Sequence, residues 1–162
     1  MPQVVDVLTA DQRRLNMSRI RGRDTKPEML IRRALHAQGF RYRLHDKGLP
    51  GCPDIVFPRY RAVIFVHGCF WHGHNCPMFR LPATRREFWE TKINANRARD
   101  VAAHEELIIA GWRVLTVWEC SVRGKNRLDL EILKGRCVDF LEGNERERVL
   151  SGIVLSDHRA CN

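Results

Sequence analysis

The residues from Val63 to Cys76 are those most able to do chemistry. An apolar run typical of a buried strand leads into three His, two Cys and two adjacent aromatic residues. Cys69, His74 and Cys76 are ligands of the type that zinc prefers, and a closed structural site needs a fourth. Cys120 is the best candidate for the fourth ligand, because it directly follows a predicted strand. The alternative is a set of buried thiols beside a surface histidine.

A carboxylate lies just upstream of this segment. Asp54 follows Pro53 at the start of a short apolar strand, and the next strand ends at Val66 and His67. This layout resembles that of the restriction-endonuclease-like nucleases, in which a Pro-Asp acid and an acid-x-Lys motif hold Mg²⁺ on adjacent strands. Val66 has no ligand side chain and His67 replaces the lysine. We therefore expect Asp54, a main-chain carbonyl and water to bind Mg²⁺, the alternative being a carboxylate that only caps a turn.

The charge of the chain predicts a polyanionic partner. Its 28 Lys and Arg residues exceed its 19 acidic residues, giving a net charge of +9 and a pI of about 9.8. Phosphate groups of DNA are the usual partners of such a surface, although a merely basic enzyme is the alternative. Phe70 and Trp71 lie in a polar loop where a core residue is not expected. With His67 and His72 nearby, they indicate a nuclease that inserts side chains into DNA.

The composition also excludes some classes of protein. No apolar run approaches the roughly 20 residues that span a bilayer, and the N-terminus lacks the features of a signal peptide. We therefore expect a cytoplasmic protein with no membrane partner, in which Cys residues are thiols or metal ligands. Cys52, Cys137 and Cys161 have no His neighbours and are expected to be plain thiols.

The apolar periodicity predicts an α/β fold in one domain, residues 1–162, with a mixed sheet flanked by helices. The expected helices cover about 9–20, 25–38, 84–110 and 128–141, and the expected strands cover 40–44, 54–57, 62–66 and 113–118. Thr9, Thr25 and Thr84 begin segments with capping-box spacing. Residues 1–23 are expected to form a basic arm that orders on DNA, or else a solvated helix, and residues 143–162 a loose tail.

In combination, these motifs resemble the very-short-patch repair (Vsr) endonuclease family, which nicks DNA beside T:G mismatches. The matching stretches span about residues 13–125 and are Asn16–Ile20, Arg23–Thr25, Leu49–Asp54, Tyr60–Cys76, Pro82–Trp89 and Gly111–Cys120. The resemblance implies a restriction-endonuclease-like fold with a structural zinc site.

The resemblance also implies catalytic roles. It makes Asp54 the Mg²⁺-binding acid, assisted by the main-chain carbonyl of Val66, where the family often has Thr. It makes His72 the general base for the attacking water, and it places His67 as a group that contacts or protonates around the scissile phosphate. Glu28 matches an acid near the site, although its position in a capping box explains it equally well.

Further roles concern DNA and the second metal. The resemblance assigns the zinc to Cys69, His74, Cys76 and Cys120. It makes Phe70, Trp71 and Trp89 the aromatic wedge that enters the base stack beside the mismatch, although Trp89 also has the spacing of a core residue. Asn96 and Asp100 match polar residues that face the site, and the alternative is solvent exposure. Trp112 and Trp118 are expected in the core.

The function implied is Mg²⁺-dependent hydrolysis of one phosphodiester beside a T:G mismatch, which leaves a 5′-phosphate. The substrate is double-stranded DNA, mismatch-repair proteins are candidate partners, and the enzyme is expected to be a monomer. Two rival functions stay open at this point. One is a restriction-type or structure-specific endonuclease of the same fold without mismatch preference, and the other is a non-catalytic zinc-stabilised DNA-binding module.

Overall fold

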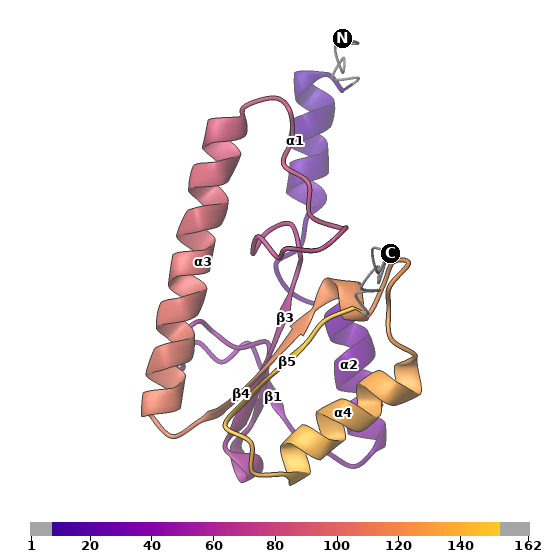
Figure 1. The fold of residues 1–162 in the computed structure, drawn as a ribbon, viewed down its shortest axis with the longest axis vertical. Coiled ribbons are helices and arrows are strands. Elements are labelled where there is room, and N and C mark those ends of the chain that lie inside the picture. Colours follow the sequence, from indigo (N-terminus) through magenta and orange to yellow (C-terminus); the bar gives the residue numbers. More distant parts are fainter. Residues whose placement is uncertain (1–7, 153–162) are drawn as a thin grey trace, which may run out of the picture.

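The computed structural model describes residues 8–152, which form a mixed five-stranded sheet with helices on both faces (Figure 1). The helices are α1 (Ala10–Arg19), α2 (Lys26–Ala37), α3 (Arg86–Ile109) and α4 (Leu130–Glu142), with short 3-10 helices at Pro58–Tyr60 and Glu119–Ser121. The strands are β1 (Arg43–Leu44), β2 (Ile55–Phe57), β3 (Ala62–His67), β4 (Arg113–Trp118) and β5 (Glu147–Leu150). The strands lie in the order β1-β2-β3-β4-β5, with antiparallel pairing from β1 to β3 and parallel pairing from β3 to β5.

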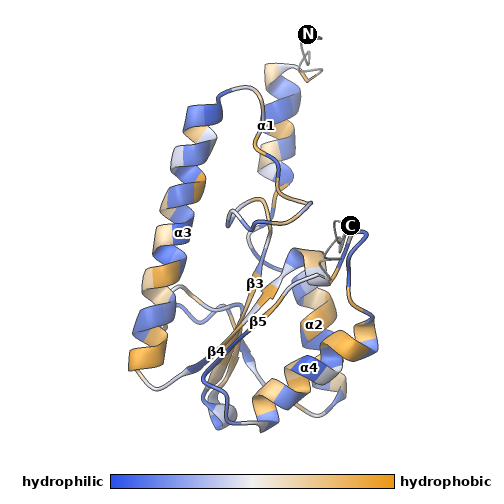
Figure 2. Cartoon of the chain, in the orientation of Figure 1, coloured by the Kyte–Doolittle hydropathy of each residue, from blue (hydrophilic) through white to orange (hydrophobic). Residues whose placement is uncertain are grey.

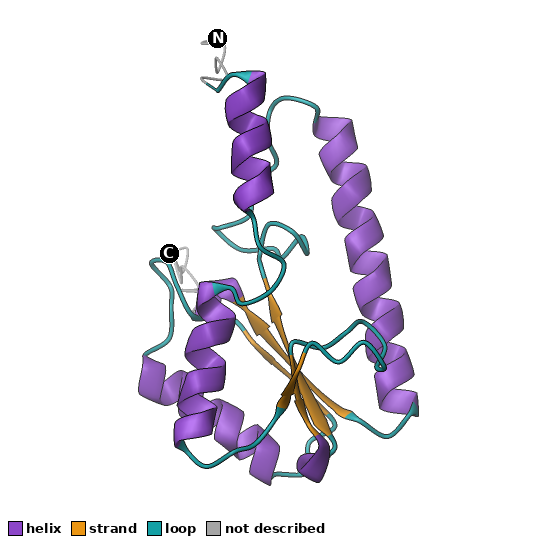
Figure 3. Cartoon of the chain, turned by 180° about the vertical axis from the view of Figure 1, so that it is seen from behind, coloured by secondary structure: helices purple, strands orange, loops and turns teal. Residues whose placement is uncertain are grey.

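The core has two layers because successive strand residues point to opposite faces of the sheet. On one face, Ile55 and Ile64 pack with buried residues of α2 and α4, such as Leu35 and Phe140. On the other face, a smaller cluster that includes Val63 packs against α3. Figure 3 shows α3 on one side of the sheet and α2 with α4 on the other. The core beneath α3 is therefore the smaller of the two.

Helix α1 and the first half of α3 extend beyond the sheet on the same side, with the loop between β3 and α3 lying between them (Figure 1). Helix α1 has no buried residue and is mostly hydrophilic (Figure 2). Its start carries the predicted capping box of Thr9 and Gln12, which confirms that part of the sequence analysis. No helix in the described part of the chain combines the length and apolar character needed to cross a membrane.

Two predicted boundaries are wrong. Helix α3 begins at Arg86, because Arg85 adopts a left-handed conformation and no side chain caps the helix, so the capping box expected at Thr84 is absent. Strand β1 covers only Arg43–Leu44 rather than residues 40–44. Phe40 is buried in the core, and the Tyr42 hydroxyl donates to the carbonyl of Arg32 at 3.0 Å. The start of the expected strand is thus held by α2 and the core instead of by the sheet.

The C-terminal segment also differs from the expected loose tail. Glu147–Leu150 form β5, which pairs in parallel with β4 and buries Leu150. The sequence signal is weak because Glu147, Arg148 and Val149 of this short edge strand are partly or fully exposed. Residues 1–7 of the predicted arm and 153–162 of the predicted tail, including Cys161, lie outside the described residues.

Candidate active site and metal centre

The antiparallel pairing of β2 and β3 brings Asp54 to the end of β3. The Val66 backbone N–H donates to Asp54 Oδ2 at 2.7 Å, so this carboxylate and the main chain of Val66 are neighbours. Burial raises the pKa of Asp54 to about 6, although the Val66 hydrogen bond opposes the shift. A buried carboxylate with so high a pKa favours a bound proton or cation.

A second acid lies near Asp54, and between the two lies a histidine that the sequence did not predict to take part. Glu28 is 1% exposed, accepts from the Asp24 backbone N–H at 2.8 Å, and accepts from Arg32 at 2.8 Å. His45 Nε2 lies 3.1 Å from Glu28 Oε1, and its Nδ1 lies 3.9 Å from Asp54 Oδ1. His45 thus lies between the two acids. In the sequence it is only a histidine in a predicted turn.

The capping explanation of Glu28 holds only in part. Its backbone N–H donates to Thr25 Oγ1 at 3.4 Å, as in a capping box. Its carboxylate, however, bonds Asp24 and Arg32 rather than returning to the backbone of Thr25. Asp24, Glu28 and His45 together could hold a metal ion, but the Arg32 guanidinium already supplies positive charge there.

His67 and His72 form a stacked pair beside Asp100. Their ring centroids are 3.9 Å apart, and the ring planes are parallel to within 1°. His72 Nδ1 lies 2.5 Å from Asp100 Oδ2, which favours the tautomer with the proton on Nδ1 and a free lone pair on Nε2. Burial lowers the pKa of His67 to about 3, so the neutral ring is favoured there. These three residues could also hold a metal ion.

One cleft of about 660 Å³ is lined by five of the residues described above, namely Asp54, His67, His72, Asp100 and His45. The cleft is bordered by β3, β4 and α3, and its residues include Arg23 from the segment after α1 and Arg97 from α3. The first four of these five were predicted as site residues from the sequence, and the structure gathers them in one cavity. Glu28 does not line this cleft and reaches it only through His45.

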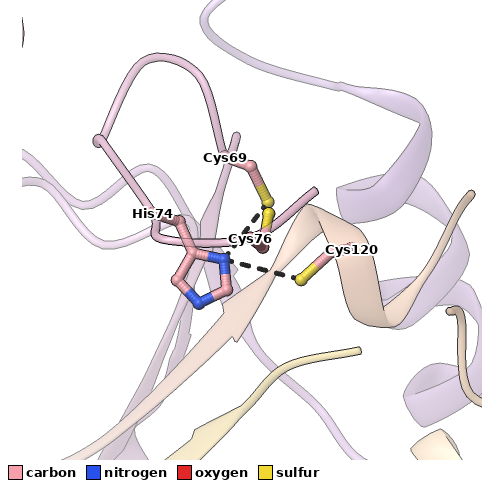
Figure 4. Close-up of side chains that lie close together, drawn as sticks. All are labelled: Cys69, His74, Cys76 and Cys120. Atoms are coloured by element: carbon pink, nitrogen blue, oxygen red, sulfur yellow. Dashed lines mark hydrogen bonds between the residues drawn. The ribbon is translucent and has the colours of Figure 1, made fainter. Parts of the chain in front are cut away.

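Four candidate zinc ligands meet where the β3–α3 loop approaches the end of β4 (Figure 4). The ligand atoms of Cys69, His74, Cys76 and Cys120 lie within 4.8 Å of one another. His74 Nδ1 is 3.6 Å from Cys69 Sγ and 3.5 Å from Cys120 Sγ. Burial raises the pKa of the Cys69 and Cys120 thiols. The structure therefore contains a possible Cys/His metal site that ties the loop to the end of β4.

Trp118 supports this site, contrary to its expected core position. Its ring stacks on His74 with centroids 4.2 Å apart and 7° between the planes, and it also lines the cleft. The Cys69 backbone N–H donates to Glu119 Oε2 at 3.2 Å. Trp112 packs against the smaller core cluster, as expected. The remaining described cysteines are Cys137, which is buried, and Cys52, which is partly buried and lines the cleft.

The three residues that the sequence predicts to form an aromatic wedge lie in their own cluster outside the two buried cores. The ring centroids of Phe70 and Trp71 are 5.1 Å apart. The ring centroid of Trp89 lies 5.4 Å from that of Phe70 and 5.9 Å from that of Trp71. All three are partly exposed. Lys92 lies over the Trp71 and Trp89 rings at 5.5 and 5.6 Å, and Asn96 Nδ2 donates to the Trp71 carbonyl at 2.8 Å.

Comparisons with known proteins identify the family of this chain. The family model described as DNA mismatch endonuclease Vsr matches residues 5–78. The DNA mismatch endonuclease Vsr of Escherichia coli is 46% identical over 154 residues, covering 94% of this chain and 99% of the relative. The chain belongs to the Vsr family. The Type II nicking enzyme V.XorIIP of Xanthomonas oryzae pv. oryzae is 47% identical over 139 residues, covering 86% of this chain and 98% of the relative.

Family membership makes this Vsr-family protein a DNA nicking endonuclease associated with mismatch repair. Its substrate is DNA, which agrees with the net charge of +9. The rival function of a non-catalytic DNA-binding module is therefore wrong.

Proposed function

We propose that this protein cuts one strand of double-stranded DNA beside a T:G mismatch and leaves a 5′-phosphate, within a short-patch repair pathway in the cytoplasm. We further propose that it acts as a monomer of restriction-endonuclease-like fold. The observation that carries the proposal is the cleft in which Asp54, the His67–His72 pair and Asp100 are gathered.

The donor set of the cleft fits Mg²⁺. Asp54 Oδ2 is engaged by the Val66 N–H, whereas Oδ1 has no hydrogen bond within the described residues. Burial raises the pKa of Asp54 more than the Val66 hydrogen bond and the nearby His45 and His72 lower it, which favours a cation bound at this carboxylate. Asp54 and the Val66 carbonyl would hold the ion with water in the remaining positions. When bound, Mg²⁺ would polarise the phosphate and stabilise charge on the leaving oxygen.

His72 is the proposed general base. Asp100 holds the ring through Nδ1, and the stacked His67 ring restricts its rotation. The Nε2 lone pair is then available to take a proton from water, as a histidine base does in general acid–base catalysis. Asp100 would stabilise the imidazolium that forms, as a carboxylate does in other acid–base pairs.

His67 is the proposed phosphate contact. Its low pKa favours a neutral ring that donates a hydrogen bond to a phosphate oxygen over one that delivers a proton. Glu28 is proposed to act through His45. Its negative charge makes the electrostatic potential around Asp54 more negative.

The Cys/His cluster is the proposed structural zinc site. Around a tetrahedral zinc ion with bonds of about 2.3 Å to sulfur and 2.0 Å to nitrogen, a sulfur and a nitrogen ligand atom lie about 3.5 Å apart. The measured separations of 3.5 and 3.6 Å from His74 Nδ1 to two thiol sulfurs match that value. With all four positions taken by protein, the ion would stabilise the loop and leave no open position for catalysis.

The aromatic wedge would provide the mismatch preference. Unstacking a base step takes a few kcal/mol, and less at a mismatch, so a wedge favours mismatched duplex. Phe70, Trp71 and Trp89 are partly exposed on a loop and helix that extend beyond the sheet. Asn96 supports the wedge by its bond to the Trp71 carbonyl.

A nicking assay tests the proposal. The purified protein should cut T:G duplexes and not matched T:A duplexes, with added Mg²⁺ required, over a panel of flanking sequences. A phosphatase-sensitive 5′ end should appear at the nick. Equal cutting of both duplexes would favour a nicking enzyme without mismatch preference. Turnover by Asp54→Ala at the wild-type rate would show that the reaction occurs elsewhere.

A further inference from the structure

Gly73 brings the loop that carries the proposed base unusually close to α3. It lies between His72 and His74, is buried, and has a φ of +61°. A Cβ at this position would lie 2.7 Å from Ile93 Cγ2 and 2.9 Å from Arg97 Cδ. Both distances are shorter than real contacts allow, so the loop needs a glycine here. The aliphatic part of Arg97 therefore packs against Gly73, the residue that follows His72 in the chain.

The position of Arg97 along α3 directs it toward the cleft. It follows the buried Ile93 by four residues and precedes Asp100 by three, so the three side chains share one face of the helix. Arg97 lines the cleft together with Asp54, His72 and Asp100.

The charge of Arg97 is not neutralised within the described part of the protein. Of the other arginines in α3, Arg86 pairs with Glu90 at 2.9 Å and Arg99 donates to Asn96. Asp100, the acid nearest to Arg97 on its helix face, is instead bonded to His72. Within residues 8–152, the Arg97 guanidinium makes neither a hydrogen bond nor an ion pair. An unpaired guanidinium that lines the proposed site of DNA cutting is suited to bind a phosphate.

The acids of the cleft make such a cation useful. Asp54, Asp100, Glu105 and Glu147 line it, and their charges oppose the entry of a phosphate backbone. One metal ion at Asp54 would neutralise only part of this charge. Arg97, an exposed residue, adds a positive group on the α3 side of the cleft.

We propose that Arg97 binds the nonbridging oxygens of the phosphate next to the one that is cut, with its stem held against Gly73. The assignment rests on the proposed function in one respect, namely that DNA is cut in this cleft. Since Arg97 packs against the loop that carries His72, the bound strand would be fixed relative to the proposed base.

The test is single-turnover nicking of T:G duplexes in which one phosphate near the nick is replaced by a neutral methylphosphonate. Wild-type protein, Arg97→Met and Arg136→Met are compared. Methionine keeps an unbranched stem over Gly73 and removes the charge. Arg136 is exposed on α4, which covers the opposite face of the sheet, and its variant should behave as wild type. Equal melting temperatures would establish that the Arg97→Met variant is folded.

We expect Arg97→Met to slow nicking of unmodified DNA by about 10- to 100-fold, as for the removal of a charged hydrogen bond. Neutralising the adjacent phosphate should slow wild type by a similar factor and slow Arg97→Met by less than about two-fold, because the pair is already broken. Arg97→Lys should recover part of the rate.

Equal sensitivity of wild type and Arg97→Met to every methylphosphonate position would overturn the Arg97 assignment. An Asp54→Ala control separates this failure from failure of the proposed function. If Asp54→Ala is inactive while the two profiles coincide, only the role of Arg97 is wrong. If Asp54→Ala nicks normally, the cleft is not the site of cutting and both proposals fall.

Discussion

At the scale of single residues, the pKa of Asp54 links function to stability. Burial raises it from 3.8 to about 6, so the folded protein holds this proton more tightly than the unfolded chain. The stabilising effect of the proton is complete below pH 3.8 and is lost as the pH rises to about 6. Above that pH, the ionised carboxylate costs about 3 kcal/mol of folding free energy in magnesium-free protein.

Asp54→Asn should therefore raise the free energy of unfolding at pH 8 in magnesium-free buffer while abolishing nicking. Asparagine can still accept from the Val66 N–H, so that hydrogen bond is kept. Denaturant unfolding of both proteins at pH 5 and pH 8 measures the effect, and the difference should be smaller at pH 5. An Asp54→Asn protein less stable than wild type at both pH values would contradict this explanation of Asp54.

Asp100→Asn tests the orientation of His72. An amide in place of the carboxylate can neither select the same tautomer reliably nor stabilise the imidazolium. We expect kcat to fall by about 10²- to 10⁴-fold, with little change in DNA affinity. Single-turnover rates and a binding isotherm measure the two quantities. A kcat within two-fold of wild type, or a loss confined to binding, would show that Asp100 does not act through His72.

At the scale of elements, the loop between β3 and α3 carries His72 and three of the four residues of the Cys/His cluster. Cys76→Ser should remove bound zinc and lower the melting temperature by about 5–10 °C, because binding energy at a structural site is folding energy. Cys52→Ser is the matched control, since Cys52 lies outside the cluster. Metal analysis and calorimetry measure both effects. A metal-free Cys76→Ser protein as stable as wild type would refute a structural role.

The sequence predicts elements where local signals agree with the tertiary structure. Helix α2 and strand β4 match their predicted ranges closely, because a capping residue, an apolar stripe and glycine mark their limits. Strand β5 is not predictable in this way, because its stability comes from pairing with β4 rather than from its own pattern. Likewise, the residue type of Cys120 identifies it as the fourth cluster residue. The roles of His45 and Arg97 are not predictable in this way, because they depend on contacts with residues that are distant in sequence.

At the scale of the whole molecule, the net positive charge should act mainly by binding the phosphates of DNA. Arg14 and Arg19 are exposed on α1, which buries no residue. Changing both to Ala should leave the melting temperature unchanged and weaken DNA binding. The slope of log affinity against log salt should also decrease by about 0.9 for each phosphate that the protein no longer neutralises. Titrations at several salt concentrations measure the slope. An unchanged slope would show that α1 does not bind the DNA backbone.

The claim that the molecule selects mismatched DNA depends on the aromatic wedge. The most direct measurement is the ratio of T:G to T:A nicking rates for wild type and for a Phe70→Ala, Trp71→Ala double variant, with melting temperatures recorded alongside. Because both side chains are partly exposed and lie outside the buried clusters, we predict that the ratio falls to about one while the protein stays folded. An unchanged ratio accompanied by a collapsed melting temperature would contradict the wedge, since the two rings would then be core residues.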